Sequence, residues 1–239
     1  MKIPKIKGII ERRILINYQI DKTILEAYLP APFTPKLVNG KGIAGICLIR
    51  LKHIRPSMLP KFFGISSENG AHRIAVEWME DGMLKEGVYI PRRDTSSQLN
   101  SLAGGRLFPG IHHHAQFNVL ENNNQYDVRF ISQDGTSLSI KAKETNQWNS
   151  DSVFDNLDCV SNFFKQGSMG YSPNGLHFDG LELRTTQWKV SLLDVESVHS
   201  SFFEDQSIFP KGSIQFDNAL LMQNIEHEWI ELDKIPKKS

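Results

Sequence analysis

Cysteine is scarce in this sequence of 239 residues, which contains only Cys47 and Cys159. Two cysteines cannot build the disulfide framework on which small secreted proteins depend. Both have apolar neighbours, in the strings Ile-Cys-Leu and Asp-Cys-Val. We therefore expect two buried free thiols that pack as small hydrophobic groups.

An excess of charge of one sign is also lacking, because 27 Lys and Arg residues balance 27 Asp and Glu residues. A chain without net charge has no field that attracts a polyanion, so we expect no nucleic-acid partner. The same balance gives little repulsion between copies of the chain. Self-association into a homo-oligomer is therefore compatible with the composition.

Long apolar runs are missing as well, since none approaches the roughly 18–20 residues that cross a bilayer. We therefore expect no membrane partner. Residues 1–5 are not followed by the apolar segment of a signal peptide, which predicts a cytoplasmic protein. A single core still accommodates this length, because chains usually divide only beyond roughly 250–300 residues. We expect one domain over residues 1–239.

Strand patterns dominate what is present. Residues 43–51 are apolar on nearly every position, which predicts a central strand covered on both faces. Ile74, Val76 and Trp78 alternate with Arg73 and Glu77 as in a half-buried strand. Turn residues separate further strand candidates at 14–18, 112–120, 126–131, 138–143, 181–190, 195–203, 213–221 and 225–232.

Helix signals are fewer. Asp21 precedes a short apolar pattern, and residues 156–166 carry an apolar stripe that ends at Gly167. A third helix is predicted to begin at residues 94–98, with Asp94 as its N-cap and Arg92 and Arg93 in solvent, and to end at residues 104–105. The expected fold class is mainly β (β-rich α+β), a twisted antiparallel sheet or partly closed barrel with two or three short helices.

Three consecutive histidines mark the segment 104–117 as unusual. Side chains alternate along a strand, so His113 shares a face with Ala115 and apolar residues further along, whereas His112 and His114 share the other face. This pattern predicts that His113 points inward. The alternative is that His113 is a structural histidine held by one hydrogen bond.

His112 and His114 also suggest a second hypothesis, because two histidines on one strand face can chelate Zn²⁺ or Fe²⁺ when a carboxylate joins them. His72 and Glu77 are candidates to complete such a metal site. No His-Glu-x-x-His motif is present. The sequence otherwise predicts no metal and no cofactor.

The string Gly105-Arg106 followed by His113 and His114 resembles the acetoacetate decarboxylase family motif, in which Gly-Arg-Glu precedes Pro-Lys-Lys. The resemblance covers residues 9–120, and the whole chain is similar to an uncharacterised branch, a domain of unknown function, of that superfamily through the strings at 65–69, 91–95 and 200–205. It implies a twisted antiparallel sheet around a buried pocket. It places His113 and His114 on the paired lysines of the family, and Glu68 near one of its glutamates.

The departures from the family motif change the expected chemistry. Imidazole cannot form an imine, so histidine at both lysine positions argues against Schiff-base decarboxylation. Leu107 stands where the family has glutamate, and Lys52 and Lys85 are the only lysines near the relevant strands.

The first functional hypothesis is a pocket for a small oxo or carboxylate metabolite. In it, His113 and Glu68 would be catalytic proton-transfer groups, and Arg106, His114 and Arg13 would bind the substrate. The other hypotheses are the metal site and a non-catalytic ligand-binding protein on an inherited enzyme fold.

Overall fold

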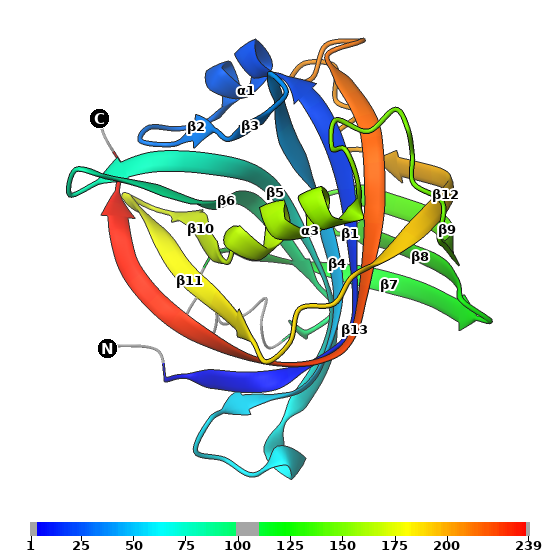
Figure 1. Ribbon diagram of the computed structural model, residues 1–239. Coiled ribbons are helices and arrows are strands. Elements are labelled where there is room, and N and C mark those ends of the chain that lie inside the picture. The colour runs from blue at the N-terminus through cyan, green and yellow to red at the C-terminus, as the bar shows by residue number, and fades with distance from the viewer. Residues whose placement is uncertain (1–3, 99–109, 238–239) are drawn as a thin grey trace.

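The computed structural model describes residues 4–98 and 110–237 and is built mostly from strands (Figure 1). The helices are α1 (Lys22–Tyr28), the short 3₁₀ turn η1 (Lys61–Phe63) and α3 (Leu157–Gln166). The strands are β1 (Ile6–Asp21), β2 (Thr34–Pro35), β3 (Leu37–Val38), β4 (Lys41–Pro56), β5 (Ile65–Glu80), β6 (Met83–Thr95), β7 (His112–Asn122), β8 (Gln125–Ser132), β9 (Ser137–Thr145), β10 (Met169–Asn174), β11 (His177–Thr185), β12 (Ser191–Ser200) and β13 (Ile214–Pro236).

Strand pairing closes this sheet twice. The strands β13, β1, β4, β5, β6, β10 and β11 pair in that order, and β11 pairs again with β13; we call this circuit the helix ring. A second circuit, the hairpin ring, runs from β6 through β7, β8, β9 and β12 to β13 and returns through β1, β4 and β5. The shared strands therefore separate two interiors, which confirms the predicted mainly β, partly closed fold.

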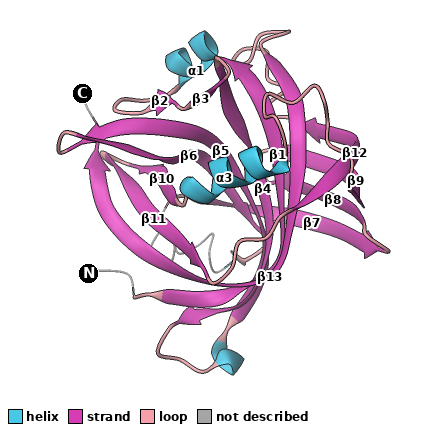
Figure 2. Ribbon diagram, viewed as in Figure 1, coloured by secondary structure: helices cyan, strands magenta, loops and turns pink. Residues whose placement is uncertain are grey.

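Each interior has its own apolar core. Ile14 and Ile46 belong to the core of the hairpin ring, whereas Leu15 and Cys47 belong to that of the helix ring. Val160 and Phe164 of α3 join the second core, and Figure 2 shows α3 lying across the strands of the helix ring. β4 is covered on both faces, which confirms the central strand predicted from its near-continuous apolar run.

Local signals placed many elements correctly. Asn39 and Gly40 both have positive φ and form the predicted turn before β4. The hairpins of β7, β8 and β9 lie where the turn residues predicted them. Asn156 caps α3, because its side chain accepts a hydrogen bond from the Cys159 backbone N–H at 2.9 Å.

Five expectations were wrong. Arg92 and Arg93 do not lie in solvent, because the Arg92 side chain is only 12% exposed and Arg93 lines a cavity inside the sheet. Asp94 is no N-cap, since it is a buried residue of β6. Residues 214–232, expected as two strands, belong to the single strand β13, in which Asn224 has φ 54° but the chain does not turn back. Cys159 is exposed because it lies on the outer face of α3. Arg73 is buried, because both faces of β5 are covered there. Within residues 4–98 and 110–237, no helix is long and apolar enough to cross a membrane.

Candidate functional site

Three arginines from different strands meet at one cavity of about 290 Å³ inside the helix ring. Arg13 lies on β1, Arg73 on β5 and Arg93 on β6. Strand register brings them together, because Cys47 on β4 pairs with Ala71, which pairs with Arg93. We call this cavity the arginine pocket.

The hydrogen bonds of these arginines go to neutral groups. The Nε–H of Arg13 donates to Cys47 Sγ at 3.1 Å, and the Nε–H of Arg93 donates to Ser172 Oγ at 3.0 Å. The Arg73 guanidinium donates to Asn17 Oδ1 and lies over the Phe164 ring, 4.4 Å from its centroid. Among the described residues, none of the three forms an ion pair with a carboxylate.

Burial dominates the electrostatics of the pocket. Arg73 is only 4% exposed, and its Nε atom has no hydrogen-bond partner in the described part of the chain. Burial lowers the pKa of Arg73 and of Arg93 to about 10, so both side chains still carry their charge at neutral pH. The pKa of the nearby His227 is lowered to about 4 by burial and then by the charge of Arg13. Among the residues that the structure describes, the pocket is therefore a cationic site whose lining contains no acidic side chain.

The rest of the pocket wall is mainly apolar, with aromatic, aliphatic and small residues from α3, β4, β6, β10, β11 and β13. Phe164, Trp188 and Trp229 supply the aromatic rings. The exposed Lys165, at the end of α3, contributes the one lysine amine among the described lining residues. Such a wall suits a small molecule with one charged end and one apolar end.

The three histidines divide between the two interiors. His113 pairs in register with Asp94 and is 41% exposed at the rim of the hairpin ring, with its Nδ1 atom 3.8 Å from Asp134. The alternation is confirmed at Ala115, which is buried in the hairpin-ring core. The structure does not bring His113 to the arginine pocket.

His112 and His114 lie on the opposite face, where His112 pairs in register with Arg93. Burial and then the charge of Arg93 lower the pKa of His112 to about 3, so its ring is neutral at pH 7. Within residues 4–98 and 110–237, no three His, Cys, Asp or Glu side chains are grouped so that they could hold a metal ion. His112 is therefore a neighbour of Arg93 in strand register, although it does not line the arginine pocket.

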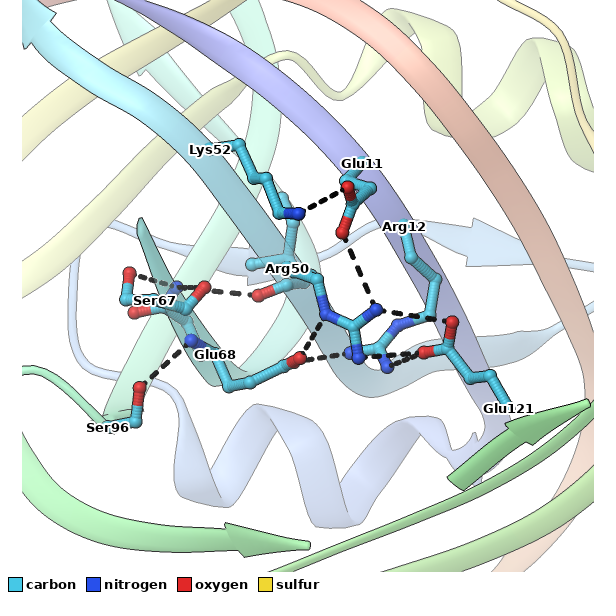
Figure 3. A network of polar contacts seen from close by, with 10 residues as sticks. Glu11, Arg12, Arg50, Lys52, Ser67, Glu68, Ser96 and Glu121 are labelled. Atoms are coloured by element: carbon cyan, nitrogen blue, oxygen red, sulfur yellow. Dashed lines mark hydrogen bonds and ion pairs between the residues drawn. The ribbon is translucent and has the colours of Figure 1, made fainter. Parts of the chain in front are cut away.

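Glu68 lies in an ion-pair network on the hairpin-ring side of the shared strands (Figure 3). Its carboxylate contacts Arg12 Nη2 at 2.6 Å and Arg50 Nε, and Glu121 also pairs with both arginines. Glu11 connects Arg50 to Lys52. Three acidic and three basic side chains therefore neutralise one another, and Glu68 is separated from the arginine pocket by the sheet.

Of the predicted substrate-binding residues, Arg13 lines the arginine pocket, whereas Arg106 lies outside the described residues. Sequence reasoning missed Arg73, Arg93 and Cys47. The available signal for Arg73 was its position directly before the apolar run at 74–76, although the alternating pattern had assigned its side chain to solvent. Its burial becomes evident only in the structure, where both faces of β5 are covered.

Comparison with protein families finds one match, which covers most of the chain. Residues 10–215 match DUF2071, a family described as an uncharacterized conserved protein. No curated protein matches the chain.

Solved structures share the fold at low sequence identity. An acetoacetate decarboxylase-like enzyme from Sphingomonas wittichii RW1 aligns with a TM-score of 0.60 at 12% identity, covering 100% of this chain and 95% of that one. Acetoacetate decarboxylase from Legionella pneumophila gives 0.59 at 11% identity, covering 97% and 88%. The enduracididine biosynthesis enzyme MppR, complexed with pyruvate, gives 0.54 at 8% identity, covering 99% and 91%. The predicted acetoacetate decarboxylase-like fold is thereby confirmed.

Proposed function

This chain belongs to the DUF2071 family of uncharacterized conserved proteins, and we propose that its arginine pocket binds a small metabolite that carries a carboxylate. The observation that supports this proposal most is the group formed by Arg13, Arg73 and Arg93, which has no acidic partner among the described residues. A buried charge costs several kcal/mol unless an opposite charge compensates it. A bound carboxylate supplies that compensation and accepts paired hydrogen bonds from a guanidinium.

The size and lining of the pocket narrow the ligand class. A volume of about 290 Å³ lies at the lower end of the range for ligand pockets, roughly 300–1,000 Å³. Trp188, Trp229 and Phe164 favour an apolar remainder of the ligand over a second charged group. The fold relative MppR has been solved in complex with pyruvate, which is a small 2-oxo acid. Pyruvate and its short-chain homologues are therefore the ligands to test first.

Calorimetric titration tests the proposal directly. Pyruvate and acetoacetate should bind the protein, and the uncharged analogues pyruvamide and acetone should not. Arg93→Leu should weaken carboxylate binding by about tenfold or more, because a hydrogen bond to a charged group contributes about 1.5–3 kcal/mol. Arg129→Leu is the matched control, since Arg129 is an exposed arginine on β8 that is paired with Asp127. Equal binding of pyruvate and pyruvamide would refute an anion site.

A catalytic role as a proton-transfer enzyme is supported by His112. Its ring lies on the same face as Arg93, whose charge helps to lower the pKa of His112 to about 3. A bound carboxylate would offset that charge and raise the pKa, so that the ring could accept a proton from the carbon next to a carbonyl group. The electron pair of that C–H bond would then move to the carbonyl oxygen, where a guanidinium stabilises the enolate. Deuterium exchange into the methyl group of pyruvate, followed by NMR, should occur with the wild-type protein and fail with His112→Gln. Saturable binding without exchange would instead indicate a binding protein.

A further inference from the structure

Cys47 is a nucleophilic side chain placed directly at the arginine pocket. It lies on β4 inside the helix ring, is 7% exposed and lines the cavity. Its sulfur accepts the Nε–H of Arg13 at 3.1 Å. The thiolate is the form of cysteine that attacks electrophiles, and here a guanidinium lies beside the sulfur.

A second observation at the same cavity points independently to a ligand. Arg73 is buried on all sides, and its Nε–H lacks an acceptor among the described residues although it lines the pocket. Burial lowers the pKa of Arg73 and of Arg93, and a negative charge in the cavity would oppose this lowering. An anion and the sulfur would therefore be held by the same set of cations.

We propose that Cys47 forms a reversible bond to the carbonyl carbon of a 2-oxo acid held in the arginine pocket; this inference rests on the function proposed above. The thiolate electron pair forms the C–S bond, and the C=O π electrons move to the oxygen. Guanidinium N–H groups stabilise that alkoxide until it takes a proton from water, which yields a hemithioketal. The thiol proton released beforehand balances the one taken up, so no oxidant or reductant takes part.

Competitive alkylation tests this role, and the chain supplies its own control. Cys159 is exposed on α3, outside the pocket, and no other cysteine is present. Iodoacetate is an anion, and iodoacetamide is its neutral analogue. The ratio of iodoacetate to iodoacetamide rates, read from the two cysteine peptides by mass spectrometry, should be about tenfold or more higher at Cys47, because cationic clefts concentrate anions. Pyruvate should protect Cys47 and leave Cys159 unaffected.

The bond itself is measured with pyruvate labelled with ¹³C at its carbonyl carbon. The wild-type protein should shift part of the signal from the ketone to the tetrahedral region, and Cys47→Ala should abolish that shift. Equal rate ratios at the two cysteines, or no reaction at Cys47, would overturn the inference. If Cys47→Ala still binds pyruvate in calorimetry, the pocket proposal survives that failure. If the wild-type protein binds no carboxylate, the proposed function itself fails.

Discussion

Replacing Arg73 with methionine should stabilise the ligand-free protein and abolish its binding of carboxylates. Burial lowers the pKa of Arg73 from 12.5 to about 10. Because this pKa is lowered on folding, the charged form of Arg73 is less favourable in the folded protein than in the unfolded chain. Arg73 is charged at neutral pH, so the full cost of holding that charge is present there. At about 1.4 kcal/mol per pKa unit, the folded state holds this charge at a cost of about 3 kcal/mol.

The substitution also removes the hydrogen bond from the charged guanidinium to Asn17, which contributes about 1.5–3 kcal/mol. The free energy of unfolding should therefore rise by up to about 1.5 kcal/mol. For a chain of this size, that change corresponds to a rise in Tm of up to about 6 °C. Urea unfolding followed by tryptophan fluorescence measures the stability, and calorimetric titration with pyruvate measures the lost affinity.

Arg12→Met is the matched control, because Arg12 is also buried, at 1% exposure, but pairs with Glu68 and Glu121. Removing it leaves Glu68 and Glu121 with Arg50 as the one remaining arginine that pairs with both of them among the described residues, and should cost about 3–5 kcal/mol of stability. If Arg73→Met lowers the free energy of unfolding as much as Arg12→Met does, a negatively charged group must already neutralise Arg73 in the ligand-free protein. The argument for an uncompensated cationic pocket would then be refuted.

Three further predictions concern acid stability, covalent chemistry and α3. The pKa values of His72 and His227 are lowered to about 3 and about 4, chiefly by burial, so between pH 6.5 and pH 5 these histidines become protonated in the unfolded chain but not in the folded state. The free energy of unfolding should therefore fall by about 2 kcal/mol per histidine over that range. In urea titrations at several pH values, His72→Phe should reduce this dependence of stability on pH. Borohydride added with pyruvate should leave the mass of the protein unchanged, whereas a reduced adduct on Lys165 would show that an imine forms. Asn156→Ala should lower the free energy of unfolding by about 1 kcal/mol through loss of the α3 cap, and it should weaken pyruvate binding because α3 supplies Phe164 to the pocket. An unchanged affinity for pyruvate would show that α3 does not contribute to the binding site.

Much of the fold could be predicted because its signals are local. The turn at Asn39 and Gly40 requires only two residues with positive φ, and the cap of α3 requires only Asn156 at the correct spacing. The continuous β13 was read as two strands because polar residues interrupt its apolar pattern near Asn224. Pairing of β13 with β1 and β11, over a large sequence separation, keeps that strand continuous.

The candidate site was much harder to predict than the fold. Alternation correctly assigned Ala115 and His113 to one face, but it cannot tell which of two covered faces contains a cavity. Arg73 and Arg93 resemble solvent-facing arginines in sequence, and only the closure of the helix ring by β10 and β11 makes Arg73 buried and Arg93 half-buried. The information that creates the pocket is therefore long-range strand pairing, which no local pattern contains.

The adjacent residues Arg12 and Arg13 show how one strand serves both interiors. A bulge between Ile10 and Arg12 interrupts the register of β1 against β4, so that Ile10 belongs to the helix-ring core while Arg12 joins the ion pairs on the hairpin-ring side. Arg13 then points into the helix ring beside Cys47. Arg12 forms ion pairs with two carboxylates, whereas in the described part of the chain Arg13 donates to the sulfur atoms of Cys47 and Met222 and pairs with no carboxylate. Substitutions on the two faces should therefore separate: those at Arg12 should act on folding, and those at Arg13 on ligand affinity with little loss of stability. Equal effects of Arg12→Met and Arg13→Met on both measurements would contradict this division.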